Sequence, residues 1–199
     1  MEESDEALVA ECQQGSLRAF ELLVKRYQPR IYRFMEKQFN SREDAEDLTQ
    51  RTFVQAYQSL NRFNSKYRFS PWLFTIARRQ GIDFLRQKGT RQRHVEKLSS
   101  EPAPAFVPDP ADLLEQQENV EEIWRWIWTK LDRRAGEVLW LRIQEELDVS
   151  EIAQVMNLSR SHVKVILHRS RKSLLQQLSQ GANSFPETSG ARFSTSTIS

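Results

Sequence analysis

Residues 152–178, IAQVMNLSRSHVKVILHRSRKSLLQQL, contain the pattern that decides the fold. A short apolar segment leads into Asn157, Leu158 and Ser159, and a basic amphipathic segment follows. Just before it, DVSE at positions 148–151 has the residue types of a capping box, which marks the start of a helix. Two short helices joined by a tight turn indicate a helix-turn-helix, a motif that places its second helix in the major groove of DNA.

The second helix of this motif divides into two faces when Ser159 is its cap, since successive residues advance by about 100° around the axis. We expect an apolar stripe to pack on Ile152, Val155 and Met156, and it consists of Val163, Ile166, Leu167, Ser170 and Leu174. The adjoining outward arc consists of Arg160, Ser161, Lys164, His168, Arg171 and Lys172. Residues near the start of the helix are the candidates for base contacts, namely Arg160, Ser161, His162 and Lys164. Later residues are the candidates for phosphate contacts, namely Arg169, Arg171 and Lys172.

Charge is distributed in blocks, although the formal net charge is only +2. Residues 78–97 and 159–178 are basic, and the segment 98–122 between them is acidic and contains no base. A solvated helix face can be basic without a ligand, and the second helix could belong to an ordinary bundle. Two basic blocks, one after an aromatic-rich loop and one inside a helix-turn-helix without acids, favour nucleic acid as the partner.

The rest of the chain has the period of helices without sustained strand-like alternation, so we predict an all-α fold. Ser16 can cap a helix that Pro29 should kink, and its apolar residues are Phe20, Leu23, Val24, Tyr27, Ile31 and Met35. Ser41 and Asp44 form a capping-box pattern before a helix expected to bury Leu48, Phe53, Ala56, Tyr57 and Leu60. Ser70 as cap and Pro71 at the first helical position predict another helix. Two more helices are expected within 121–131 and 136–143.

Proline and charge mark a boundary between two small helical domains, predicted at 1–95 and 119–178. Pro102, Pro104, Pro108 and Pro110 are hostile to a helix interior and indicate an extended acidic linker at 96–118. The tail 179–199 is rich in Ser, Thr and Gly and has no apolar period. We therefore expect the tail to be disordered.

The first domain carries two candidate surfaces. A polar helix face of Asp44, Asp47, Gln50 and Gln55 is either a partner surface or merely solvated. Downstream, the aromatic residues Phe63, Tyr67, Phe69 and Trp72 alternate with Arg62, Lys66 and Arg68. This pattern suits single-stranded nucleic acid, because bases stack on rings while cations follow the phosphates. The alternative is that the aromatic residues fill the core, which we expect for Phe74 and Phe84 and consider for Phe69.

Several function classes find no support in the sequence. No apolar run approaches the roughly 20 residues that span a bilayer, and the acidic N-terminus lacks a signal-peptide layout, so we expect a cytoplasmic protein without membrane insertion. The single Cys12 fits a core thiol better than a redox sensor. His94, His162 and His168 have no ligand cluster around them, and the glycines form no phosphate loop. We therefore expect no metal, no cofactor and no enzymatic activity.

Several segments in register resemble the extracytoplasmic-function (ECF) sigma factors, small bacterial sigma factors that contain only regions 2 and 4. These segments are SDEALVAECQQGSLRAFELLVKRYQPRIY, DAEDLTQRTFVQAYQSLNRFN, FSPWLFTIARRQGIDFLRQ and LDRRAGEVLWLRIQEELDVSEIAQVMNLSRSHVKVILHRSRKSL. The resemblance covers residues 4–90 and 118–178, in the order and with the linker of that family. A series of motifs in this order is far more specific than a lone helix-turn-helix.

The resemblance implies a role for each surface. Binding of core RNA polymerase falls on Asp44, Glu46, Asp47 and Gln50. Melting of the promoter −10 element and binding of its single strand fall on Arg62, Asn64, Lys66, Tyr67, Arg68, Trp72, Arg78 and Arg79. Recognition of the duplex −35 element falls on Arg160, Ser161, His162, Lys164, His168, Arg169 and Arg171. The family is usually held by an anti-sigma factor, so such a partner is implied as well, although no residue here identifies one.

Three positions depart from the usual pattern of that family. Arg51 stands where an acid is common, and Arg79 stands where Asn is common. Asn157 takes the place of a frequent Gly in the turn, but Asn tolerates the left-handed conformation. The alternative function is a free-standing helix-turn-helix regulator that acts without polymerase. Such a regulator would need a sensor or dimerisation surface in the first domain.

Overall fold

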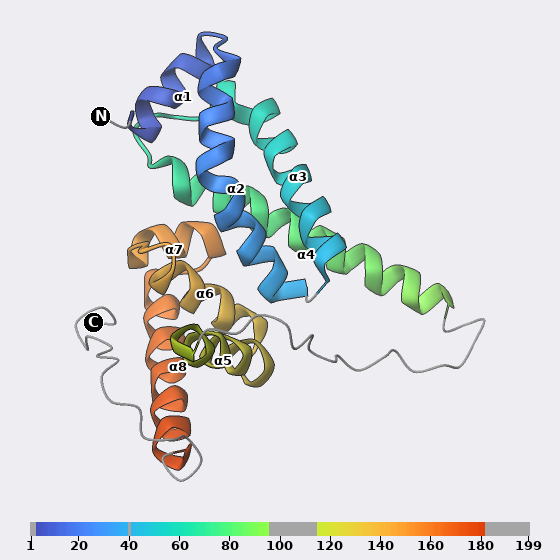
Figure 1. Cartoon of the computed structure of the whole chain (residues 1–199), viewed down its shortest axis with the longest axis vertical. Coiled ribbons are helices and arrows are strands. Elements are labelled where there is room, and N and C mark those ends of the chain that lie inside the picture. Colours follow the sequence, from blue (N-terminus) through green and yellow to red (C-terminus); the bar gives the residue numbers. More distant parts are fainter. Residues whose placement is uncertain (1–2, 40, 96–114, 182–199) are drawn as a thin grey trace. The chain divides into compact units, whose positions relative to one another are not determined.

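The computed structural model describes residues 3–39, 41–95 and 115–181, and every regular element within these ranges is a helix (Figure 1). This confirms the predicted all-α fold. The chain divides into two compact units, Met1–Arg125 and Trp126–Ser199. Most of the predicted linker, 96–114, lies outside the described residues, as does the tail from residue 182, so the predicted domain boundaries stay predictions.

The first unit contains α1 (Asp5–Gln13), α2 (Leu17–Phe39), α3 (Arg42–Ser59), the 3-10 helix η1 (Leu60–Arg62) and α4 (Phe69–Val95). Two predicted caps are confirmed, because Ser16 Oγ accepts from Ala19 N–H and Ser41 Oγ accepts from Asp44 N–H, each at 3.2 Å. Gly15 adopts a left-handed φ of +97° between α1 and α2, a backbone conformation that residues other than glycine rarely adopt. α2 continues through Pro29 as one helix, so the proline does not end it.

Aromatic rings in edge-to-face contact fill the core of the first unit. Phe34 of α2 meets Phe74 of α4 at a centroid distance of 5.3 Å, and Tyr27 meets Phe69 at the same distance. The Tyr27 hydroxyl also donates to the Asp5 carboxylate, which ties α1 to the same point. Such aromatic pairs contribute about 0.5–1.5 kcal/mol beyond their buried area, so these contacts hold α1, α2 and α4 together.

Two predictions about the first unit are wrong. Tyr57 is 50% exposed, although its ring contacts that of Phe20 at a centroid distance of 4.9 Å. The buried residues of α3 include Thr52, which was not among those predicted. The Thr52 hydroxyl donates a hydrogen bond to the Leu48 carbonyl at 2.7 Å, and this bond allows the polar side chain to be buried.

The start of α4 also differs from the prediction. The helix begins at Phe69, so Ser70 and Pro71 lie inside its first turn instead of at the cap and the first position. Pro71 is tolerated there because the first N–H groups of a helix have no partner within the helix. Ser70 is buried and not a solvent-exposed cap. Burial of Phe69 against Tyr27 accounts for the earlier start.

The second unit contains α6 (Arg133–Ile143), α7 (Val149–Met156) and α8 (Arg160–Gly181), and α5 (Glu115–Lys130) crosses into it from the first. Asp132 caps α6 by accepting from Ala135 N–H at 3.0 Å. Gly136 lies directly against the ring of Trp128, since a Cβ atom at this position would be only 2.7 Å from Trp128 Cε3. The close approach of α5 and α6 therefore requires a glycine.

We expect Gly136→Ala to lower the free energy of unfolding of the second unit by about 1–3 kcal/mol, because the added methyl overlaps the Trp128 indole. Urea denaturation followed by tryptophan fluorescence measures the effect. Gly89→Ala is the matched control, since no heavy atom beyond its own stretch of helix lies within 4 Å of a Cβ there. It should raise stability by about 0.4–1 kcal/mol, and a shift of the same sign for both variants would contradict the packing argument.

Candidate nucleic-acid interface

The helix-turn-helix begins with the predicted capping box. The Asp148 carboxylate accepts from Ser150 N–H at 2.6 Å and from Glu151 N–H at 2.8 Å. In return, Glu151 Oε2 accepts from Asp148 N–H at 2.8 Å. These reciprocal bonds satisfy donors that the first turn of α7 would leave unpaired, and they fix where the motif starts.

The turn between α7 and α8 depends on Asn157, which adopts φ 53° and ψ 53°. This left-handed conformation allows Leu158 N–H to donate back to the Ala153 carbonyl at 2.9 Å. Ser159 Oγ then accepts from His162 N–H at 3.2 Å, which confirms Ser159 as the cap of α8. Asn157 thus performs the conformational role that a glycine has in many such turns.

The two predicted faces of α8 are present. Val163, Leu167 and Ser170 are buried, as are Ile152, Val155 and Met156 of α7, and Ile166 and Leu174 are half-buried. The candidate DNA-binding side chains Arg160, Ser161, His162, Lys164, His168 and Arg169 are exposed, and Arg171 is half-buried. Because α7 and α6 hold the apolar face, the exposed arc is presented on a fixed support.

The loop 63–68 of the first unit is shaped by Asn64. Its side-chain Oδ1 accepts from Lys66 N–H, and its carbonyl accepts from Tyr67 N–H, both at 3.0 Å. Asn side chains commonly build such turns by accepting from the backbone two residues on. The turn leaves Lys66 and Arg68 exposed and Tyr67 59% exposed, so an aromatic ring and two cations stand in solvent together.

The aromatic residues of the first unit divide into two groups. Phe63, Phe69 and Phe74 are buried in the core, and Phe84 is half-buried. Trp72 is half-buried, with its ring 5.0 Å from Phe63 and 5.5 Å from Phe69. Trp72 therefore lies at the rim of the core, next to the loop that carries the exposed Tyr67. Further along α4, Arg78 is half-buried and Arg79 is exposed, and Arg62 is exposed in η1.

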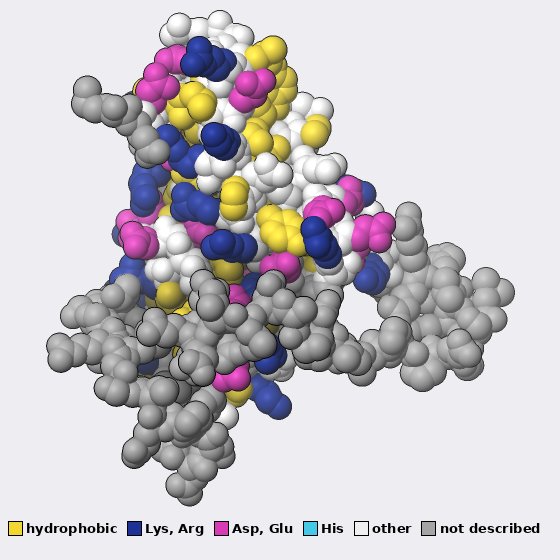
Figure 2. Space-filling model, viewed as in Figure 1, with side chains coloured by type: hydrophobic (Ala, Val, Ile, Leu, Met, Phe, Trp, Pro, Cys, Tyr) yellow, Lys and Arg dark blue, Asp and Glu magenta, His cyan; other side chains and the backbone are white. Residues whose placement is uncertain are grey.

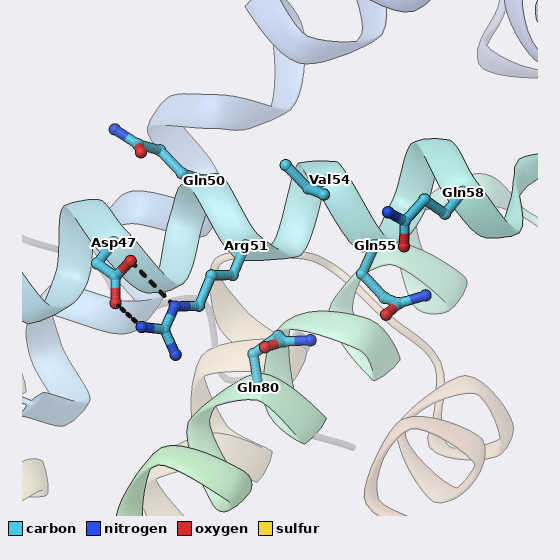
Figure 3. A pocket seen from close by; sticks show the side chains of 7 residues that line it. All are labelled: Asp47, Gln50, Arg51, Val54, Gln55, Gln58 and Gln80. Atoms are coloured by element: carbon cyan, nitrogen blue, oxygen red, sulfur yellow. Dashed lines mark hydrogen bonds and ion pairs between the residues drawn. The ribbon is translucent and has the colours of Figure 1, made fainter.

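The predicted acidic face lies on α3, and each of its carboxylates has a cationic partner. Asp47 forms a bidentate pair with Arg51, with N–O distances of 2.7 and 3.0 Å (Figure 3). Glu46 pairs with Arg42 at 3.0 Å, and Asp44 pairs with Lys88 of α4 at 3.6 Å. The four-residue spacing of Asp47 and Arg51 is a signal for such a pair, whereas nothing local indicates Lys88.

A pocket adjoins this face on the side of Arg51. Its lining consists of Asp47, Gln50, Arg51, Val54, Gln55 and Gln58 from α3 and Gln80 from α4 (Figure 3). Val54 is 58% exposed, and Gln50 and Gln55 are exposed as predicted for the polar face. The surface combines one compensated ion pair, several amides and an apolar centre, which is the composition of a polar protein interface.

Charges on the visible face of the first unit are mixed, with Lys and Arg side chains interspersed among acidic and apolar ones (Figure 2). Within the described ranges, no three His, Cys, Asp or Glu side chains form a group able to hold a metal ion. None of the helices described is long and apolar enough to cross a membrane. Burial, followed by the nearby Glu11 carboxylate, raises the pKa of the Cys12 thiol and keeps it in the less reactive protonated form.

Comparison with known proteins identifies the family. The family model for Sigma-70 region 2 matches residues 23–91, and that for Sigma-70, region 4 matches residues 129–174. The ECF RNA polymerase sigma factor SigX of Bacillus subtilis is 30% identical over 165 residues, which cover 80% of this chain and 83% of that protein. The chain belongs to the ECF RNA polymerase sigma factors. A free-standing regulator would not carry region 2, so that alternative is set aside.

Other sigma factors align over similar lengths. SigM of Bacillus subtilis is 28% identical over 161 residues, covering 81% of this chain and 96% of that protein. The fold is shared with CnrH in complex with the cytosolic domain of CnrY, with a TM-score of 0.65 at 24% identity over 89% of this chain and 99% of that one. It is also shared with RpoE in complex with the anti-sigma factor NepR from Bartonella quintana, with a TM-score of 0.64 at 20% identity, covering 82% and 98%.

The two matched regions contain the three candidate surfaces of this ECF sigma factor. Region 2 covers α3, the loop 63–68 and most of α4, whereas α1 lies outside it. Region 4 covers α6, α7 and the exposed arc of α8. The protein therefore functions as a sigma factor in transcription initiation.

Proposed function

We propose that this sigma factor binds core RNA polymerase through α3, reads the −35 element with α8, and opens the −10 element with the loop 63–68 and the start of α4. The observation that carries the proposal is the presence of regions 2 and 4 on one chain, each with its candidate residues exposed or half-buried on a packed helical support. It acts in the cytoplasm by binding and deforming DNA, with no cofactor and no chemistry of its own.

At the −35 element, α8 enters the major groove of duplex DNA. Arg160 and Lys164 stand exposed near its N-terminus, where side chains of a recognition helix reach base edges. Ser161 and His162 lie beside them, and Arg169, Arg171 and His168 follow the phosphates further along. Each well-placed base contact gives about 1–3 kcal/mol of discrimination, so this helix sets the −35 preference.

At the −10 element, the exposed ring of Tyr67 stacks on an unpaired base while Lys66 and Arg68 follow the phosphates. Stacking contributes about 1–3 kcal/mol per base, which offsets part of the cost of opening the duplex. Trp72, at the rim of the core, supports the base displaced from the helix, and Arg62, Arg78 and Arg79 contact the backbone. Asn64 contributes by shaping the loop, which is the role that its two hydrogen bonds support.

Core polymerase binds the face of Asp44, Glu46, Asp47 and Gln50. The pairs of Glu46 with Arg42 and of Asp47 with Arg51 are solvent-exposed, and exposed pairs are worth only about 0–1 kcal/mol. A basic segment of the polymerase can therefore take the place of Arg51 or Arg42 at little cost. An anti-sigma factor is a further partner, in line with the complex of RpoE with NepR.

Run-off transcription with core polymerase from the native host tests the function as a whole. The purified protein should confer specific initiation on a subset of promoters from a genomic pool, and core polymerase without it should not. Tight duplex binding by the protein alone, together with no specific initiation on any promoter, would sink the proposal.

Asp47→Arg should weaken binding to core polymerase roughly tenfold or more, because it places a second cation beside Arg51 on the docking face. Fluorescence anisotropy of labelled sigma factor titrated with core polymerase measures the affinity. Asp83→Arg is the matched control, since Asp83 is an exposed, ion-paired acid on α4 outside that face. Equal affinities of the two variants would remove Asp47 from the interface.

Arg160→Ala and Lys164→Ala should each cost about 1–3 kcal/mol in holoenzyme binding at matched −35 sites, because both side chains lie on the exposed arc of α8. Competition between matched and mutated −35 duplexes gives the specificity. Lys130→Ala, an exposed lysine of α5, provides the comparison for lost charge. Unchanged discrimination in both α8 variants would contradict their assignment to base contacts.

A further inference from the structure

The end of α1 contacts the base of the loop 63–68. The Gln13 side chain donates from Nε2 to the Leu60 carbonyl at 3.0 Å and to the Phe63 carbonyl at 2.9 Å. Leu60 begins η1 and Phe63 follows its end, and Phe63 N–H donates to the same Leu60 carbonyl at 3.0 Å. One amide group therefore closes both ends of the turn that leads into the loop.

Phe63 connects the Gln13 contact to the residues proposed to bind the unpaired strand. Its buried ring lies 5.0 Å from the ring of Trp72 and 6.0 Å from that of Phe69. The next residue, Asn64, accepts from the N–H groups of Lys66 and Tyr67. The Phe63 carbonyl, which Gln13 holds, therefore directly precedes the turn that exposes Lys66 and Tyr67.

α1 is a firm support for this contact. Leu8 and Val9 are buried, and the Asp5 carboxylate accepts from the Tyr27 hydroxyl and from the Arg26 guanidinium of α2. Two residues after the helix ends, the left-handed Gly15 donates its N–H to the Cys12 carbonyl at 2.9 Å. Gln13, the last residue of α1, is therefore held at a defined place relative to α2.

We propose that Gln13 is a positioning residue for the loop 63–68 when that loop binds the unpaired promoter strand. The inference rests on the proposed function of the loop. α1 lies outside residues 23–91, the part that matches Sigma-70 region 2, so the support comes from beyond the matched region. The chemistry fits, because carbonyl oxygens only accept hydrogen bonds and a glutamine amide offers two donors.

Gln13→Met, Gln13→Glu and Gln14→Met test this role. Methionine has nearly the length of glutamine but no donor, and glutamate places an acceptor against the two carbonyls. Gln14, the adjacent residue, caps α1 through its backbone N–H and serves as the control. Each full-length protein is assembled with core polymerase. The probe is a fluorescein-labelled single strand with the non-template −10 sequence of a promoter found by run-off transcription, compared with a −35 duplex.

Gln13→Met should weaken single-strand binding by the holoenzyme about threefold to tenfold relative to Gln14→Met, given that one net hydrogen bond corresponds to about twofold to tenfold. Gln13→Glu should weaken single-strand binding more than Gln13→Met does. Affinity for core polymerase and affinity for the −35 duplex should match those of Gln14→Met, whereas the urea midpoint should fall because two hydrogen bonds of the free protein are lost. Equal single-strand affinities of the two variants, or an equal loss of affinity for core polymerase and for the −35 duplex, would overturn the positioning role.

Tyr67→Ala, measured alongside, separates this inference from the proposed function. If Tyr67→Ala loses single-strand binding and Gln13→Met does not, only the positioning role fails. If Tyr67→Ala binds the single strand as wild type does, the proposed function of the loop fails.

Discussion

Tyr27 is the residue on which the arrangement of the first unit depends. The Tyr27 ring packs against Phe69 at the start of α4, and the Arg30 guanidinium lies 4.6 Å from the centroid of the same ring. The Tyr27 hydroxyl donates to Asp5 of α1. Burial, followed by the hydrogen bond to Asp5, raises the pKa of Tyr27 well above its usual range. The hydroxyl therefore remains a donor at physiological pH, and one side chain joins α1, α2 and α4.

The surfaces proposed to bind partners follow from this packing. The start of α4 is fixed by Phe69, which places Trp72 at the rim of the core, while α1 brings Gln13 to the carbonyls that begin the loop. The charged face of α3 is organised differently, because its pairs are solvent-exposed and weak. A buried aromatic core thus holds the loop proposed to bind the unpaired strand, whereas the face proposed to bind polymerase can exchange its exposed ion pairs for those of a partner.

Local patterns in the sequence predict a large part of this structure. The capping box at Asp148 and Glu151, the cap at Ser159 and the buried stripe of α8 depend on residues close in sequence, and all are present. Apolar periodicity misplaces Tyr57 and overlooks Thr52, a polar residue that is buried with its hydroxyl donating to the helix backbone. The contacts of Lys88 with Asp44 and of Gln13 with Phe63 join residues far apart in sequence, for which periodicity carries no signal.

The presence of two proposed DNA-binding surfaces on one chain affects the affinity for promoters. The exposed arc of α8 and the loop 63–68 each offer only a few cations, and the formal net charge of the chain is +2, so neither surface can rely on a strong general attraction to phosphates. Linking two weak sites on one chain makes the second binding event intramolecular and raises overall affinity without new contacts. This gain in affinity requires that the −35 and −10 elements be bound at the same time. In the proposed function, core polymerase holds the two sites at the spacing that this requires. If both surfaces act as proposed, promoter affinity should depend on the holoenzyme, and the sigma factor alone should bind DNA weakly.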